Sequence, residues 1–206
     1  MIHDNFKKLV RRWICSGAVQ GDTNVRPSNI YDFTDFEGYT GKSSDTKSTL
    51  LSYQYIINGR DLADYTFDNI LTKKGGTALN SSDIAFFAVI GNSIENEPDY
   101  CLGSLITDDY LKVTTIKSAV SEILHTTVIN NTSDNEVTFN EIGFALHCGY
   151  TGTNAGSVWN GARTNTPNFL LIKEVLPEPM TIPANSSINI TFNLFGDTPV
   201  VVTPSE

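Results

Sequence analysis

Three histidines are the first candidates for proton transfer in this chain, because the histidine side chain titrates near neutral pH. They are His3, His125 and His147, and Cys148 follows the last of them directly. A cysteine beside a histidine suggests a thiol nucleophile with its base. Successive residues of a strand point to opposite faces, so His147 and Cys148 cannot face each other on one strand. We therefore expect packed sheet histidines and no catalytic pair.

Carboxylates form a second group of candidates, because two of them at a suitable distance perform acid–base chemistry. The candidates lie in turn-like sequence, where solvent-exposed side chains are expected: Glu95, Glu97, Asp99, Asp108 and Asp109. Asp32, Asp35 and Glu37 also lie close together, but they lack the ligand spacing of a calcium loop. The carboxylates therefore predict solvated turns, and no metal site is expected.

The cysteine spacing gives no support for metal or redox chemistry. Cys15, Cys101 and Cys148 are odd in number, far apart and without a CxxC pair. We expect free, buried thiols in a protein that folds in a reducing cytoplasm. No GxGxxG, P-loop or GxSxG motif occurs either. The sequence therefore favours a structural or binding protein over an enzyme, with no cofactor.

One stretch between predicted strands is a candidate for ligand or receptor contact. Residues 149–168, GYTGTNAGSVWNGARTNTPN, show little strand pattern, and loops of this length in compact domains are usually functional or disordered. A Trp in a Gly/Asn/Thr-rich loop suits contact with a glycan or a protein. The contact residues would be Tyr150, Trp159 and Arg163. The alternative is that Trp159 folds inward and holds the loop in place.

The chain from residue 50 onward is predicted to be mainly β. Apolar or alternating runs are separated by turn clusters, at 50–57, 84–90, 111–115, 120–129, 137–147, 169–175 and 187–194. The run IAFFAVI is continuous, as in a strand buried on both faces. The last run alternates, with Ile188, Ile190, Phe192 and Leu194 facing inward. Together the runs predict an antiparallel β-sandwich, jelly-roll wiring being one option, over 50–206 after a loop-rich segment at 17–49.

Two consecutive runs predict a β-hairpin. The runs 120–129 and 137–147 are joined by an Asn-rich turn, which is the usual sequence signal for paired neighbouring strands. Such a hairpin would place His125 and His147 on adjacent strands.

A short amphipathic helix is predicted at residues 1–14, with Asp4 as N-cap and Gly17 as stop. A helix this short needs a partner surface. It packs on its own domain or, in the more specific hypothesis, forms an anchoring arm (residues 1–16) that docks on a neighbouring subunit or another protein. A membrane surface is a weaker alternative. The residues expected at the interface are Phe6, Leu9, Val10, Arg11, Arg12 and Trp13.

Charge divides the 206-residue chain into two unequal parts. The net charge is −9, but residues 1–14 carry +3, which leaves −12 for the rest. Such an acidic chain is not expected to bind nucleic acid directly, because phosphate contacts come chiefly from Lys and Arg. No apolar run is long enough for a membrane span, and the N-terminus lacks the pattern of a signal peptide. Without a secretion signal, sequons such as Asn131-Thr132-Ser133 are expected to be accidental.

Three stretches of the second half follow one another in a familiar order: 140–144 (NEIGF), 169–176 (FLLIKEVL) and 179–192 (PMTIPANSSINITF). They resemble a pattern in bacteriophage virion proteins of the tail and fibre type, where "EIGL" precedes "LLAREVL", "PVTVPAG" and "SLTVTYTI". The segment 90–102 is similar to the "GTG…DYAL" segment that often comes before them. Lys173 stands where Arg is usual, and Asn185 where Gly is usual.

The resemblance implies a virion structural protein of the tail, collar or fibre, made in the host bacterial cytoplasm and assembling as a homo-oligomer. Its partners would be other copies of itself and other virion proteins, with the helix as attachment arm. The motifs are scaffold features: Pro177, Pro179 and Pro183 end one strand and begin the next, and Gly143 permits a bulge or a close backbone approach. The alternative is a receptor- or carbohydrate-binding adhesin that contacts host surface glycan through the 149–168 loop.

Overall fold

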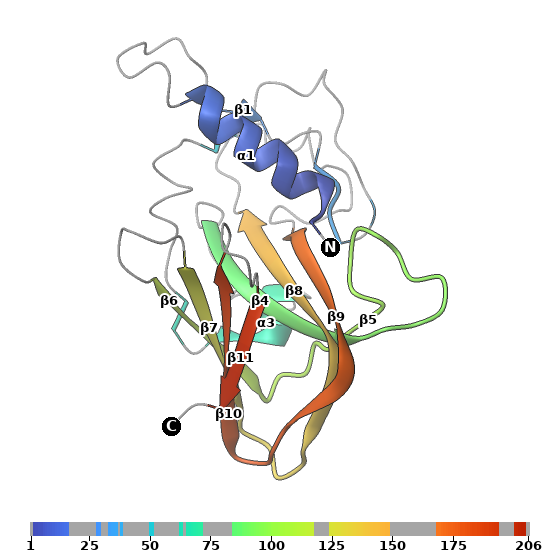
Figure 1. Cartoon of the computed structure of the whole chain (residues 1–206). Helices are drawn as coiled ribbons and strands as arrows, with labels where there is room; N and C mark the ends of the chain where they lie inside the picture. Colours follow the sequence, from blue (N-terminus) through green and yellow to red (C-terminus); the bar gives the residue numbers. More distant parts are fainter. Residues whose placement is uncertain are drawn as a thin grey trace.

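The structure of the protein is a computed structural model that describes most of the second half of the chain and shorter parts of the first. The described residues are 2–16, 28–29, 33–36, 38, 50–51, 62–63, 65–71, 84–117, 124–148, 168–193 and 200–204. This part of the chain is mainly β, with two antiparallel sheets and one substantial helix (Figure 1). The predicted fold class is therefore confirmed.

The strands are divided between two main sheets. The larger sheet has the order β11-β10-β7-β6-β3, with bounds Val200–Pro204, Ser186–Asn193, Leu124–Asn131, Leu111–Lys117 and Tyr65–Thr66. The second sheet has the order β5-β4-β8-β9, with bounds Ser104–Leu105, Ile84–Asn92, Val137–Cys148 and Asn168–Ile182. The remaining elements are the strand pair β1 (Ser28–Asn29) and β2 (Leu50–Leu51) and the helices α1 (Asp4–Ser16) and α3 (Phe67–Leu71).

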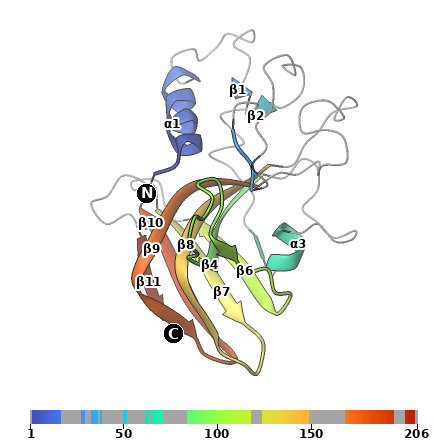
Figure 2. The same cartoon turned by 90° about the vertical axis from the view of Figure 1, so that its right-hand side faces the viewer.

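Side chains from the two main sheets meet in a common core. The Phe144 ring of β8 lies 4.6 Å from the Phe192 ring of β10 and 5.3 Å from the His125 ring of β7, centroid to centroid. The backbone N–H of Ala88 on β4 donates to the Thr127 hydroxyl of β7 at 2.8 Å. Figure 2 shows the two sheets as neighbouring layers. These contacts are those expected of a β-sandwich.

Strand β10 follows the predicted alternation. Ile188, Ile190 and Phe192 are buried, whereas Asn189, Thr191 and Asn193 are half-buried. The period of two is a local property of an extended chain with one buried face, so the sequence is sufficient to predict it.

The predicted hairpin is wrong. Strand β7 pairs with β6 and β10, whereas β8 pairs with β4 and β9, so the connection at 132–136 crosses from one sheet to the other. Alternation and turn residues show where two strands end and begin, but they do not select the sheet that each strand joins. As a result His125 and His147 lie in different sheets.

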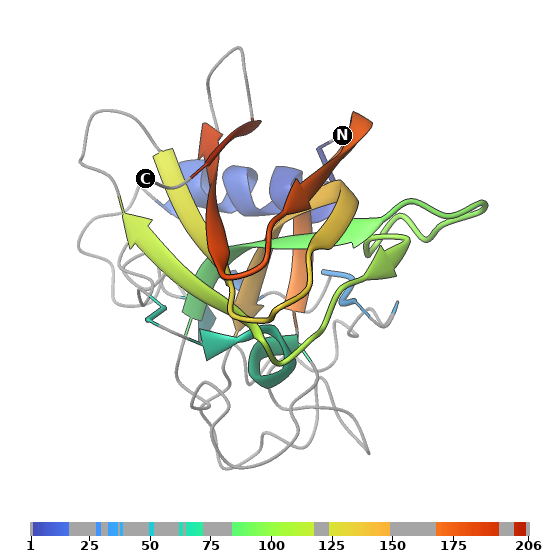
Figure 3. The ribbon, with the colours of Figure 1, turned by 90° about the horizontal axis from the view of Figure 1, so that it is seen from below.

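The four-stranded sheet is buried on both faces at its centre, which explains the continuous apolar run of β4. One face meets the five-stranded sheet, and on the other the β4–β5 loop (93–103) places Leu102 over Gly91 and Gly143. The fully buried residues of this strand are Ala85, Phe87, Ala88, Val89 and Ile90. Seen from below, the β4–β5 loop projects on the side of the molecule opposite β6 and β7 (Figure 3).

The two N-terminal segments share the core of the β body. Helix α1 lies across one end of the four-stranded sheet (Figure 1), and its Phe6 and Leu9 belong to the main hydrophobic cluster. Phe33, from the predicted loop-rich segment, packs edge-on against Phe169 of β9, with ring centroids 5.5 Å apart. The backbone N–H of Phe36 donates to the Asn168 carbonyl at 3.0 Å.

Strand β9 differs from the prediction at its prolines. It does not stop before Pro177 but continues to Ile182, and it is an edge strand of its sheet. Between the pairs Glu141–Val175 and Phe139–Met180 the register shifts, so residues 176–179 bulge opposite a single residue of β8. Proline is tolerated at sheet edges and bulges because no ladder hydrogen bond depends on its missing N–H.

The turn between β9 and β10 contains a residue in the left-handed region. Asn185 has a φ of +53°, which glycine adopts freely and asparagine tolerates better than most residues. Its backbone N–H donates to the Ser133 carbonyl at 3.1 Å, and its amide donates to the Asp134 carboxylate at 3.1 Å. The positive φ explains why Asn185 can stand where the virion-protein pattern usually has glycine.

A single asparagine holds the end of the molecule where these turns meet. The Asn131 side chain is fully buried, and its Nδ2 donates to the carbonyls of Asn135 (2.7 Å), Pro183 (3.1 Å) and Ile182 (3.3 Å). Its Oδ1 accepts from the Ser133 N–H at 3.1 Å and from the Ser133 hydroxyl at 2.8 Å. One side chain thus joins the β7–β8 connection to the β9–β10 turn.

Gly143 confirms the predicted close approach. A Cβ at this position would lie 2.7 Å from Val89 Cγ2, 2.9 Å from Leu170 Cδ1 and 3.2 Å from Leu102 Cδ2. All three neighbours are buried, so they have little room to move away.

Gly143→Ala is therefore expected to lower the free energy of unfolding by about 1–3 kcal/mol, the usual cost of overpacking a well-filled core. Urea unfolding of the two proteins measures the difference. The exposed Ser104→Ala on neighbouring β5 is the control and should change stability by less than about 0.5 kcal/mol. A Gly143→Ala protein as stable as the Ser104→Ala control would contradict the close approach.

Candidate functional site

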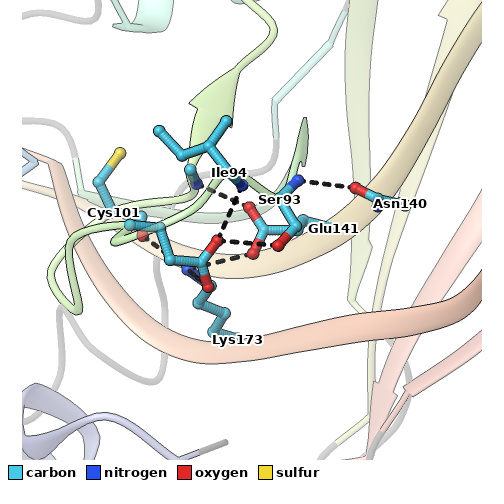
Figure 4. A network of polar contacts seen from close by, with 8 residues as sticks. Ser93, Ile94, Cys101, Asn140, Glu141 and Lys173 are labelled. Carbon is cyan, nitrogen blue, oxygen red and sulfur yellow. Dashed lines mark hydrogen bonds and ion pairs between the residues drawn. The ribbon is translucent and has the colours of Figure 1, made fainter.

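The most elaborate polar cluster in the described part of the chain lies under the β4–β5 loop, on the outer face of the four-stranded sheet. Lys173 Nζ of β9 lies 3.1 Å from Glu141 Oε1 of β8 (Figure 4). It also lies 2.8 Å from Glu97 Oε1 of the loop. The Glu141 side chain is fully buried, and the Lys173 and Glu97 side chains are 9% and 24% exposed. We call these three residues the lysine–carboxylate cluster.

The cluster also binds backbone groups of the loop. Lys173 Nζ donates to the Cys101 carbonyl at 3.2 Å, and Glu141 Oε2 accepts the Gly103 N–H at 2.7 Å. Glu97 Oε2 accepts the Ser93 hydroxyl at 3.2 Å and the backbone N–H of residue 94 at 3.4 Å. Both ends of the loop are thereby held against β8 and β9.

Strand geometry explains why these residues meet. Strands β8 and β9 are paired neighbours, in which Glu141 lies opposite Val175 and Gly143 lies opposite Lys173. Glu141 and Lys173 are therefore diagonal neighbours on the same face of the sheet. The pairing of the two strands, and not closeness in the sequence, brings Glu141 and Lys173 together. Gly143, between the two charged residues, leaves the space that Leu102 fills.

Electrostatics favour the charged form of Glu97, the most exposed member of the cluster. The hydrogen bond from Lys173 is the main reason that the pKa of Glu97 is lowered from its usual value of 4.5, against the opposing effect of burial. Burial raises the pKa of the nearby Cys101 thiol to about 11, so this thiol stays protonated near neutral pH and is a poor nucleophile. The carboxylates accept protein donors, so the arrangement is suited to holding a loop in place.

The predicted turn carboxylates have different environments. Glu95, Asp99, Asp108 and Asp109 are exposed, as expected. Glu97 and Asp35 correct the prediction of solvated side chains. Glu97 is largely covered and ion-paired with Lys173, and Asp35 is buried. The partner lysine is distant in sequence, so the turn pattern carried no sign of it.

Both sheet histidines are packed, as predicted. His125 is buried beside Phe86 and Phe144. His147 is buried too, and its Nδ1 lies 2.8 Å from the Asn168 side-chain oxygen, whose amide nitrogen donates to a carbonyl of α3. The sandwich separates the two rings, so they do not form a joint site.

The cap of the helix lies one residue earlier than predicted, because His3 caps it and Asp4 does not. The His3 carbonyl accepts the N–H groups of Phe6 at 3.1 Å and Lys7 at 3.4 Å, and His3 Nδ1 accepts the Asn5 N–H at 3.1 Å. Asp4 is the first helical residue and forms an exposed ion pair with Lys7 at 3.1 Å. Its negative charge is still favourable at the helix N-terminus.

The start of α1 is bound to β9 and to the segment around residue 34. The His3 N–H donates to the Leu171 carbonyl at 2.9 Å. The Asn5 side chain is fully buried, donates to the carbonyls of Thr34 (2.8 Å) and Leu170 (3.1 Å), and accepts the Thr34 N–H at 3.0 Å. These bonds cover part of the β9 edge, where an unpaired strand would otherwise be open to other chains.

The packing corrects the expected role of two arm residues. Phe6 and Leu9 are buried in the protein's own core, which favours the alternative that this helix face packs on its own domain. Val10 is half-buried against the same cluster. The side chains of Arg11, Arg12 and Trp13 lie outside the described part of the structure, so their anchoring role remains a prediction.

The candidate contact loop also lies outside the described residues. Tyr150, Trp159 and Arg163 belong to it, and their role as ligand or receptor contacts remains a prediction. Within the described ranges, no group of acidic, His or Cys side chains has the arrangement of a metal site. None of the helices described is both long and apolar enough to cross a membrane.

Sequence reasoning missed the residues that organise the structure, namely Lys173, Glu141, Asn131 and Asn5. Lys173 had a signal, because a lysine that interrupts the apolar run FLLIKEV needs a partner if the strand is buried. The asparagines had none, because this chain is rich in asparagine throughout.

Comparisons with known proteins give no relative from which function could be transferred. No family model, no curated protein and no solved structure matches this chain.

Proposed function

We propose that the protein is a bacteriophage virion structural component of the tail, collar or fibre, which assembles as a homo-oligomer and docks to other virion proteins. One observation carries this proposal. The stretches that resemble such proteins, 90–102, 140–144 and 169–176, are distant in sequence but contribute Glu97, Glu141 and Lys173 to one buried cluster.

The co-location supports the proposal because it gives the resemblance a physical meaning. The similar residues are those that hold one loop against one sheet face, together with Gly143, which makes room for Leu102 of that loop. A chance match of strand patterns would not be expected to select Glu141 and Lys173, an oppositely charged pair whose side chains contact each other. The shared feature is a scaffold, which suits a structural protein.

The fold adds a constraint on how the N-terminal arm could attach to a partner. Its inner face is occupied by its own sheet, so a partner would meet the outward face, where the Lys7 side chain is 67% exposed. Removal of residues 1–14 would also remove Phe6 and Leu9 from the core, so a loss of assembly would not be specific to the outward face. Charge changes on the outward face are a cleaner test.

Mass spectrometry of purified particles from a phage that carries this chain tests the proposal directly. The protein is expected in the particles in multiple copies. Lys7→Glu combined with Arg11→Glu is expected to reduce its incorporation severalfold. The two positions are one helical turn apart, so the double substitution reverses the charge along one face of the helix. Lys112→Glu, a single charge reversal on β6 away from the helix, is the control and should incorporate normally. A protein abundant in the infected cell but absent from particles would overturn the proposal.

A further inference from the structure

His3 is one of the residues that connect the start of α1 to the edge of β9. The His3 N–H donates to the Leu171 carbonyl at 2.9 Å, and its carbonyl accepts the first N–H groups of the helix. Its ring atom Nδ1 accepts the Asn5 N–H at 3.1 Å. Ile2, just before it, forms an antiparallel bridge with Ile172. His3 is therefore both the helix cap and part of the attachment to the sheet.

The cap requires the neutral ring. A protonated Nδ1 carries a hydrogen and cannot accept the Asn5 N–H, and the imidazolium charge would face the positive end of the helix dipole. Nδ1 of His3 would then be a hydrogen-bond donor that faces another donor, the Asn5 N–H. Loss of an N-cap side chain favours fraying of the helix from this end.

Several charges act on the ring. Asp99 on the β4–β5 loop and Asp4 on the helix favour its protonation, whereas Lys8 and Lys7 oppose it. The charged residues of adjacent β9 are Lys173, which belongs to the lysine–carboxylate cluster, and the half-buried Glu174.

Burial is the largest effect and lowers the pKa of His3 below its usual 6.5. The undocked arm consequently binds a proton at a higher pH than the docked arm. Docking is therefore fully favoured above pH 6.5 and weakens as the pH falls from that value through the lowered pKa.

We propose that His3 makes α1 an acid-sensitive latch, in which protonation of the ring raises the fraction of molecules whose N-terminal helix is detached from β9. Detachment exposes the apolar side chains of Phe6 and Leu9, while the β body stays folded. The latch is a property of this chain alone and does not rest on the proposed virion role.

Hydrogen–deuterium exchange of the full chain at about pH 7.5 and about pH 5 tests the latch. The intrinsic exchange rate at each pH, divided by the observed rate, gives the protection factor of residues 4–16. This protection is expected to fall on the order of tenfold at the lower pH, the effect of losing one helix cap. Peptides from β8 report on the body and should keep their protection.

Two variants separate the latch from general acid sensitivity. His3→Asn keeps an N-cap acceptor that does not titrate, so protection of the helix should become independent of pH in this range. Asp99→Asn, at an exposed position, removes a charge that favours protonation, so the midpoint of the loss should move to lower pH. Equal protection at both pH values in the wild type would overturn the proposal. An equal loss of helix protection in His3→Asn, or an unmoved midpoint in Asp99→Asn, would also overturn it.

Discussion

Lys173→Met is expected to lower the free energy of unfolding by about 3–5 kcal/mol near neutral pH, the usual cost of removing one partner of a buried ion pair. The substitution leaves the fully buried Glu141 without its counter-ion, and Glu97 loses its closest cation. Both carboxylates would then repel each other under the loop. Urea unfolding followed by circular dichroism measures the loss.

Two further variants identify charge as the cause. Lys173→Arg keeps the positive charge and can donate to both carboxylates, so it should recover most of the stability. Glu141→Gln in the Lys173→Met background removes the uncompensated charge and should recover part of the loss. Stability of Lys173→Met within about 1 kcal/mol of the wild type would show that the cluster does not contribute as inferred.

Asn131→Asp is expected to produce a second large loss, about 3–5 kcal/mol, by placing a buried charge without a partner. The amide nitrogen of Asn131 donates to three backbone carbonyls, and a carboxylate oxygen in its place would face those carbonyls without a hydrogen to share. The turns that it joins should separate, and thermal unfolding would show the change as a lower midpoint.

The neighbouring residue offers a matched control for this change. Asn130 is half-buried, and its side-chain oxygen accepts the Ser187 hydroxyl at 3.3 Å, which a carboxylate also does, so Asn130→Asp should cost less than about 1 kcal/mol. The buried aspartate of Asn131→Asp should have a raised pKa, so its folded state binds a proton more readily than its unfolded state. The deficit relative to the wild type should therefore shrink as the pH falls towards 4. Equal losses of stability in both variants would contradict the inference that Asn131 joins the β7–β8 connection to the β9–β10 turn.

Local sequence patterns predicted the individual elements well. The amphipathic spacing around Phe6 and Leu9 gave the helix, and the alternation of Ile188, Ile190 and Phe192 gave β10, because both periods arise within a few residues of backbone. The continuous run of β4 correctly indicated burial on both faces. Each of these predictions depends only on neighbours in the chain.

Pairing of distant segments was harder to predict, and most of the corrections arise there. The β7–β8 hairpin failed because the two strands join different sheets, a choice made by long-range packing. The cap at His3 depends on a ring that reaches back to the Asn5 N–H, and the environment of Glu97 depends on Lys173. Neither the sheet that a strand joins nor the lysine beside Glu97 is visible in a window of ten or fifteen residues. The cap at His3 is the exception, because Asn5 lies only two residues away.

The sequence by itself determined that this is an acidic, mainly β protein with a basic amphipathic helix at its start, because composition, charge and periodicity are properties of the chain alone. Only the tertiary structure decided which surface that helix faces and which residues hold the loops. Those outcomes depend on burial: Phe6 and Leu9 are drawn into the core, and the buried charges of Lys173 and Glu141 must find each other once they leave water.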